Sequence, residues 1–195
     1  MRIHWETRIL GKKYLLFFQS MDIPTAETAG VSAEVAGTTE YVLFMDYDNV
    51  KDEKLRRELI ALQEAHILGD FHVFATNEFG RHVIGLDRMP LREALDVVYN
   101  STCDAVYKRG SRINEYRTWI LRALEKGDRD KPKYLYPVES PYNETRLQSQ
   151  AHAKFLQLYY GAKVRLVNPD GNDILIIEGY KTGSKIHVAD LAKKG

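Results

Sequence analysis

The chain has 195 residues, of which 44% are apolar and 28% are charged, and its net charge is +1. This length suits one domain with a sizeable core, and no segment has the apolar length that a membrane span needs. The single cysteine, Cys103, excludes an internal disulfide framework and a thiolate zinc cluster. We therefore expect one domain over residues 1–195, and the N-terminus, which lacks an apolar secretory region, predicts a cytoplasmic protein.

The first expected elements are two strands with an irregular segment between them. A strand is predicted over residues 12–21, centred on the apolar run 14–18. Residues 22–40 turn to Thr, Ala, Gly and Glu with little periodicity, which predicts a mobile loop or arm. The apolar residues 41–48 then predict a second strand.

Two carboxylates close this second strand. Asp46 and Asp48 are two residues apart, and residues at this spacing on a strand share one face. Carboxylates placed side by side repel each other unless a divalent cation or a basic group lies between them. Hard oxygen ligands with no thiolate nearby favour Mg²⁺ or Mn²⁺. A structural alternative is that Asp48 or Asn49 caps the next helix.

The remaining core elements follow from periodicity and from the positions of Gly and Pro. They are a helix over 51–68, strands over 71–77 and 81–86, a helix from Pro90 to about 100–101 and a strand over 118–124. Together with the strand over 41–48 they give the order βαββαβ. This order predicts an α+β fold of the ferredoxin-like or RRM-like type, in which both helices cover one face of an antiparallel sheet and leave the other face open. The first and third strands are then neighbours, so Asp46 and Asp48 are expected beside the strand that carries His82.

A C-terminal extension is expected over about 140–195, beyond a core at about 41–126. It consists of a helix and a closing hairpin, in addition to the extra N-terminal strand. Asn143 is expected to cap the helix and Gly161 to follow its end. The inward residues would be Leu147, Ala151, Phe155 and Leu158, and the hairpin would pair 164–167 with 174–178 across a turn at 168–172.

Basic residues are concentrated in residues 105–133, which hold nine Lys or Arg against four Asp or Glu. Such a stretch can follow a phosphate backbone. The interleaved acids equally fit a solvated face with charges of both signs. Several tyrosines pose the same choice between stacking on bases and ordinary core or rim positions: Tyr134, Tyr136, Tyr142, Tyr159 and Tyr160.

Three short motifs occur in a fixed order: Asp46-Tyr-Asp48, the hairpin segment that ends Gly80-Arg-His82, and Cys103-Asp104. This set resembles the catalytic core of the archaeo-eukaryotic primase superfamily over roughly residues 41–126. That family has a hydrophobic-Asp-hydrophobic-Asp motif, a small-residue-x-His motif on a hairpin and a later hydrophobic-Asp motif. The resemblance implies a template-dependent nucleotidyltransferase of the primase or DNA polymerase type that acts in DNA replication, and a plasmid or viral origin fits such a compact form.

The resemblance also implies roles for these residues. Asp46, Asp48 and Asp104 match the catalytic carboxylates that hold Mg²⁺ or Mn²⁺, and Asp87 and Asp96 are the other candidates for the third position. In phosphodiester formation two such cations stabilise the attacking and leaving oxygens.

His82 matches the histidine that contacts the phosphates of the incoming nucleotide, with Gly80 as the small residue. Basic residues would offset the charge of the triphosphate: Arg81, Arg122 and Lys126, with Lys108 and Arg117 as further candidates. The expected partners are a DNA template and nucleoside triphosphates. The sequence has no zinc-binding Cys/His module and no helicase motif, so a helicase or an accessory primase domain would come from another chain.

Two other functions remain open at this stage. The motif Asp46-Tyr-Asp48-Asn-Val50 also fits a haloacid-dehalogenase-type phosphatase, with Asp46 as nucleophile, Asp48 as acid/base and the later Lys126, Asp128 and Asp130. That family needs a doubly wound parallel sheet, whereas a hairpin is predicted here. The second alternative is a non-catalytic single-stranded nucleic-acid-binding module that uses the open sheet face. A rolling-circle nuclease needs a His-hydrophobic-His pair, which the sequence lacks.

Overall fold

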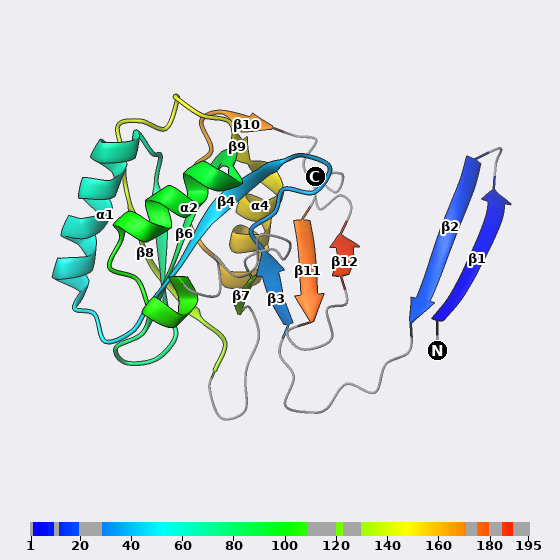
Figure 1. Ribbon diagram of the computed structural model, residues 1–195, viewed down its shortest axis with the longest axis horizontal. Coiled ribbons are helices and arrows are strands. Elements are labelled where there is room, and N and C mark those ends of the chain that lie inside the picture. The colour runs from blue at the N-terminus through cyan, green and yellow to red at the C-terminus, as the bar shows by residue number, and fades with distance from the viewer. Residues whose placement is uncertain are drawn as a thin grey trace.

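Figure 1 shows the computed structural model of the chain. The structure describes residues 30–108, 120–122 and 130–169 in full, and residues 2–9, 12–19, 29, 170, 175–179 and 185–188 by their backbone. The helices in the described residues are α1 (Asp52–His66), α2 (Leu91–Asn100) and α4 (Gln150–Tyr160). The strands are β1 (Arg2–Ile9), β2 (Lys12–Gln19), β3 (Ala29–Ser32), β4 (Glu40–Tyr47), β5 (Phe71–Ala75), β6 (Arg81–Pro90), β7 (Ile120–Arg122), β8 (Lys133–Val138), β9 (Gln148–Ser149), β10 (Pro169–Asp170), β11 (Leu175–Gly179) and β12 (Lys185–Val188).

The main sheet is largely antiparallel and follows the path β10-β9-β6-β5-β8, with β4 also paired to β6. β5 and β6 form the predicted hairpin, and β4 lies on the other side of β6. The first and third strands of the predicted core are therefore neighbours, as expected. In this register Asp46 is paired with His82. The fold is thus an α+β fold built on a mainly antiparallel sheet.

The strand predicted over 118–124 is observed as β7, but it pairs with β3 in a second sheet of order β12-β11-β3-β7. The described pairings therefore do not show the ferredoxin-like strand order. β1 and β2 pair with each other in a sheet of their own.

The helices α1 and α2 cover one face of the main sheet, and the sequence explains why. Leu55, Leu59 and Leu62 lie at helical spacing on α1 and are all buried. Asp52 and Glu53 occupy its first turn, where the helix dipole favours negative charge. Both helices are observed within two residues of their predicted bounds. Ser101 ends α2 by donating its backbone N–H to the carbonyls of the last helical turn.

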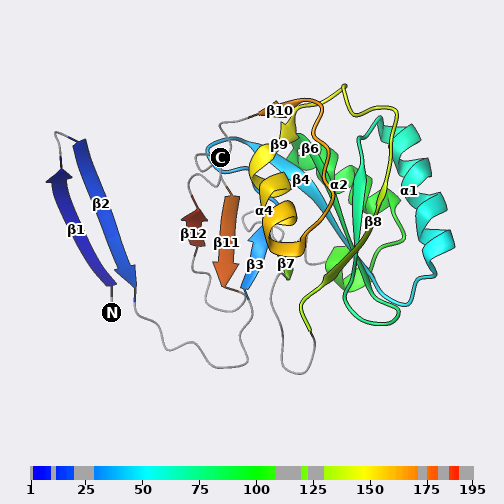
Figure 2. The same cartoon turned by 180° about the vertical axis from the view of Figure 1, so that it is seen from behind.

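The second face of the main sheet is also covered, so the prediction of an open face is wrong. Figures 1 and 2 show α2 and α4 on opposite sides of β4 and β6. The ring of Phe44 on β4 meets the ring of His152 on α4, with centroids 6.0 Å apart. The ring of Phe74 on β5 lies 5.0 Å from that of Tyr160. The apolar surface on this face is large enough that leaving it in water would be unfavourable.

The predicted C-terminal helix begins later than expected and turns a different face inward. Its N-cap is Ser149, whose hydroxyl accepts the backbone N–H of His152, whereas the Asn143 side chain is bonded to the backbone N–H of Asp70. The buried residues of α4 are His152, Ala153, Phe155 and Leu156, while Leu147 and Leu158 are exposed. Gly161 follows the helix in a left-handed conformation, with φ 64°, as predicted.

Two further predictions fail in the irregular regions. Residues 164–167 form no strand, because β11 pairs with β12 and with β3 instead of closing the predicted hairpin. The segment 22–40, predicted to be a loop, contains β3, and its residues 22–28 lie outside the described part. Within the described residues, no helix has both the length and the apolar character to cross a membrane.

Candidate functional site

The two central strands bring Asp46 and His82 together. Asp46 Oδ1 lies 3.6 Å from His82 Nε2, across the pairing of β4 with β6. Neighbouring residues on a strand point to opposite faces, and Tyr47 faces α1, where its hydroxyl bonds to Glu58. Asp46 therefore faces the α4 side, and 35% of its side chain is exposed. One carboxylate at this position is reachable from solvent and has a histidine behind it.

His82 is the buried member of this pair, and only 5% of the residue is exposed. Burial, together with the nearby positive charge of Arg122, lowers the pKa of His82 to about 3. The imidazole is therefore neutral at pH 7, so its contact with Asp46 is not an ion pair. Its buried Nδ1 atom has no hydrogen-bond partner among the described residues. A neutral histidine offers one N–H donor and one acceptor, and one nitrogen here is unused.

Asp48 lies just beyond β4 and is exposed. The alternative in which Asp48 or Asn49 caps α1 is wrong, because the N-cap of that helix is Lys51 and no side chain caps it. Asn49 takes a left-handed conformation with φ 53°, which Asn tolerates better than most residues. Asp48 is thus an exposed carboxylate that does not serve the start of α1.

Asp104 is brought beside Asp46 through the backbone. Its N–H donates to the carbonyl of Asp46 at 2.7 Å. Its Oδ1 accepts the backbone N–H of Tyr107 at 2.8 Å, so one carboxylate oxygen caps the helical turn at 105–108. The third motif therefore lies next to the first, but half of its carboxylate has a structural role.

The carboxylates do not form a closed metal cage. Among the residues that the structure describes, no three His, Cys, Asp or Glu side chains converge as metal ligands. Mg²⁺, however, is usually bound by one or two carboxylates together with substrate phosphates, and it keeps several waters. Asp46 and Asp48 are two solvent-accessible carboxylates at one strand end, which is the type of ligand that Mg²⁺ uses.

A network on the opposite face of β4 links the strand end to the loop that carries Asp104. Glu58 of α1 accepts the Tyr47 hydroxyl at 3.0 Å and the backbone N–H of Thr102 at 2.5 Å through one oxygen. Its other oxygen accepts the Thr102 hydroxyl at 2.5 Å. Burial and the Glu58 charge raise the pKa of Tyr47, so the phenol remains a donor. Glu58 and Thr102 were not predicted from the sequence, because no local pattern links residues 44 positions apart.

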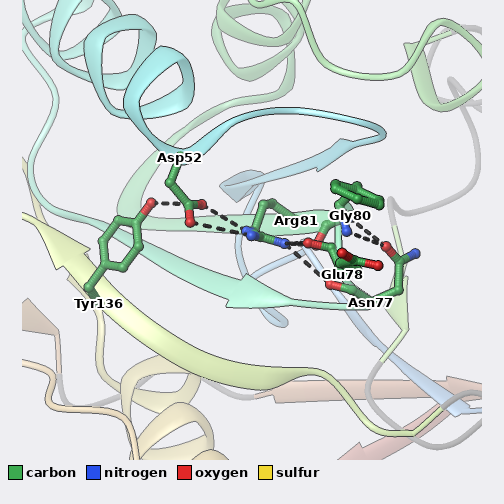
Figure 3. A network of polar contacts seen from close by, with 7 residues as sticks. Asp52, Asn77, Glu78, Gly80, Arg81 and Tyr136 are labelled. Atoms are coloured by element: carbon green, nitrogen blue, oxygen red, sulfur yellow. Dashed lines mark hydrogen bonds and ion pairs between the residues drawn. The ribbon is translucent and has the colours of Figure 1, made fainter.

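Arg81 does not lie with His82, because it points to the α1 side of the sheet. Figure 3 shows its guanidinium between Asp52 and the turn at 77–80. Nε and Nη2 donate to the two oxygens of Asp52 at 2.9 and 3.3 Å, and Nη1 donates to the carbonyls of Asn77, Glu78 and Gly80. These bonds occupy the donors that were expected to bind a triphosphate.

The other predicted residues are dispersed. The charge of Arg122 on β7 contributes to the lowered pKa of His82, and its Nη1 donates to the carbonyl of Asp130 at 3.0 Å. Lys108 donates to the carbonyls of Tyr99 and Ser101. Asp87 is buried on β6, where its Oδ2 accepts the N–H of Gly69 at 2.6 Å and burial raises its pKa. Asp96 is exposed on α2, and Arg117, Lys126 and Asp128 lie outside the described residues.

Three of the five tyrosines considered for base stacking make ring or cation–π contacts, while the Tyr136 hydroxyl donates to Asp52 Oδ1 at 3.2 Å on the α1 side. Tyr134 contacts the ring of Phe74 at 5.4 Å, and Tyr160 contacts Phe155 at 5.6 Å. Tyr159 has Lys131 Nζ 4.8 Å from its ring centroid. These contacts place the rings at the rim of the layer between α4 and the sheet.

Comparisons with known proteins add no family to this geometry. No family model matches the chain, and neither the curated proteins nor the solved structures include a significant match.

The described pairing of β4 is antiparallel, whereas a haloacid-dehalogenase-type phosphatase needs a parallel sheet. The open sheet face required by an RRM-like binding module is covered by α4.

Proposed function

We propose that this chain is a template-dependent nucleotidyltransferase of the primase or DNA polymerase type, acting in DNA replication. The observation that supports it most is the pairing of Asp46 with His82 on neighbouring central strands, 3.6 Å apart. Two facts add to it. Asp104 is hydrogen-bonded to the backbone of Asp46, and Asp48 is exposed at the same strand end without capping α1.

The strand order gives further support. The order β4-β6-β5 corresponds to the first, third and second strands of a ferredoxin-like unit. We also propose the complete ferredoxin-like strand order for this core. We further propose that the protein is cytoplasmic and works on a DNA template. A helicase or an accessory primase domain would be supplied by another chain.

In the proposed reaction a 3′ oxygen bonds to the α-phosphorus of a nucleoside triphosphate, and pyrophosphate leaves. Asp46 and Asp48 would hold Mg²⁺ or Mn²⁺, which would neutralise phosphate oxygens when bound. Arg122 supplies a fixed positive charge for the triphosphate. His82 is neutral, so it would offer an N–H donor to a phosphate oxygen without adding charge. Since His82 is 5% exposed, the atoms that cover it must shift for direct contact.

Template-directed incorporation of a labelled nucleotide tests this proposal. The purified chain is assayed with Mg²⁺ or Mn²⁺ beside the double variant Asp46→Ala, Asp48→Ala, and a phosphatase substrate is included. Metal-dependent products that disappear in the double variant support the proposal. Phosphate release that needs Asp46, without incorporation, would favour the phosphatase. Metal-independent binding of single strands without either activity would favour a non-catalytic module.

A further inference from the structure

The turn between β5 and β6 presents an exposed aromatic ring. Phe79 is 55% exposed, whereas the other four phenylalanines with described side chains are 9% exposed or less: Phe44, Phe71, Phe74 and Phe155. A phenylalanine ring gains free energy when it leaves water, so a ring held this far out favours a ligand that covers it.

The exposure of Phe79 does not come from a loose turn. Asn77 Oδ1 accepts the backbone N–H groups of Phe79 and Gly80, at 2.9 and 2.6 Å. The Arg81 guanidinium donates to the carbonyls of Asn77, Glu78 and Gly80, and it also donates to the carboxylate of Asp52 (Figure 3). The backbone of residue 79 is therefore held on both sides, so a ligand that covers the ring costs little backbone freedom on binding.

The same turn is joined to the strand end that carries the candidate carboxylates. The carbonyl of Phe79 accepts the backbone N–H of Val50 at 3.2 Å, two residues beyond Asp48. The exposed residues of the two joined segments are Asn77 and Glu78 in the turn, and Asp48, Asn49 and Lys51 around Val50. These segments carry charges of both signs, whereas the Phe79 ring is uncharged and its flat face suits an uncharged, flat group better than a phosphate.

We propose that the Phe79 ring is a stacking platform for a nucleobase at the end of β4. The proposal rests on the proposed function, because a nucleotide held by Asp46 and Asp48 is what brings a base to this turn. The base can belong to the nucleoside triphosphate or to a single-stranded template, and the two sources share the stacking chemistry. Arg81 then acts as a positioning residue, which fixes the turn and does not contact phosphate.

Calorimetric titration of the full chain in Mg²⁺ tests this stacking site. The ligands are a deoxynucleoside triphosphate, inorganic triphosphate and a single-stranded oligothymidylate. The variants are Phe79→Ala, Phe79→Trp and the matched control Leu158→Ala, which removes another exposed apolar side chain from α4. We expect Phe79→Ala to weaken at least one base-containing ligand about tenfold and to leave inorganic triphosphate unchanged. Phe79→Trp and Leu158→Ala should bind like the parent, and the ligand that is weakened identifies the source of the base.

Several results would overturn the stacking site. These are parent-like binding of both base-containing ligands by Phe79→Ala, an equal loss for inorganic triphosphate, and no binding of either base-containing ligand by the parent. A change confined to sedimentation behaviour would instead assign the ring to a protein contact. Incorporation by Asp46→Ala separates the two proposals. If that variant stays active the proposed function fails, whereas an inactive Asp46→Ala beside a parent-like Phe79→Ala rejects the stacking site alone.

Discussion

Asp46 and His82 face each other across the two central strands, with Oδ1 and Nε2 3.6 Å apart. The carboxylate is partly exposed, while the histidine is buried and neutral. This combination differs from an ordinary ion pair, in which both partners carry charge. The carboxylate is the partly exposed member of the pair, and the neutral histidine lies behind it.

Glu58→Gln should disturb the candidate site from the opposite face of β4. The amide cannot accept from the Tyr47 hydroxyl, the Thr102 N–H and the Thr102 hydroxyl as a carboxylate does. We expect a loss of about 1–2 kcal/mol in the free energy of unfolding. If the network positions Asp104, the Mn²⁺ concentration for half-maximal activity should also rise several-fold.

Glu64→Gln is the control for this change, because Glu64 is exposed on the same helix. Urea unfolding and Mn²⁺ titration of incorporation are measured for both variants. A stability loss in Glu58→Gln with an unchanged Mn²⁺ requirement would limit Glu58 to a structural role.

Arg81→Lys should lower stability more than it lowers triphosphate affinity. A lysine cannot bind both oxygens of Asp52 and three turn carbonyls at once. We expect the free energy of unfolding to fall by about 2 kcal/mol. Urea unfolding and triphosphate titration measure the two effects. Unchanged stability with lost triphosphate binding would restore the role that was predicted for Arg81 from the sequence.

His72 should make the protein lose stability in mild acid. Burial lowers its pKa to about 4, although the charge of Asp70 opposes this in part. Between about pH 6.5 and 4 the unfolded chain binds the proton and the folded protein does not, so stability falls as the pH falls. One such histidine contributes a slope of about 1.4 kcal/mol per pH unit within this window.

His72→Leu should therefore reduce the acid slope of the unfolding free energy by about that amount. His66→Leu, at a half-buried position on α1, is the control. Urea midpoints at pH 7 and pH 5 measure the slope. A slope in His72→Leu equal to that of the parent would show that folding does not lower the pKa of His72.

The elements with a clear hydrophobic period were predicted from the sequence. β4, α1, the hairpin of β5 with β6, and α2 were all found near their expected bounds. The pairing of Asp46 with His82 followed from this order, because the first and third strands of such a unit are neighbours. Local pattern was sufficient there because each of these elements buries a regular stripe or run of apolar residues.

The remaining elements depended on contacts that the sequence does not encode locally. α4 has apolar residues on several sides, so its inward face could not be chosen before its position on the sheet was known. β8 contains Pro137 and two half-buried tyrosines, so its sequence lacks the regular alternation of apolar and polar residues that predicts a strand. Arg81 was assigned to phosphate as a basic residue next to His82. Its ion pair with Asp52 joins residues 29 positions apart, so no local sequence pattern indicates it.

The proposed site stands or falls with the rate of template-directed nucleotide incorporation by Asp46→Asn, measured beside the parent and Asp96→Asn. The parent and both variants are first matched for folding by their urea midpoints. We expect Asp46→Asn to lose at least about a hundredfold in rate, because a neutral amide would hold a divalent cation less well, and Asp96→Asn on α2 to match the parent. Parent-like incorporation by Asp46→Asn would contradict the proposed site.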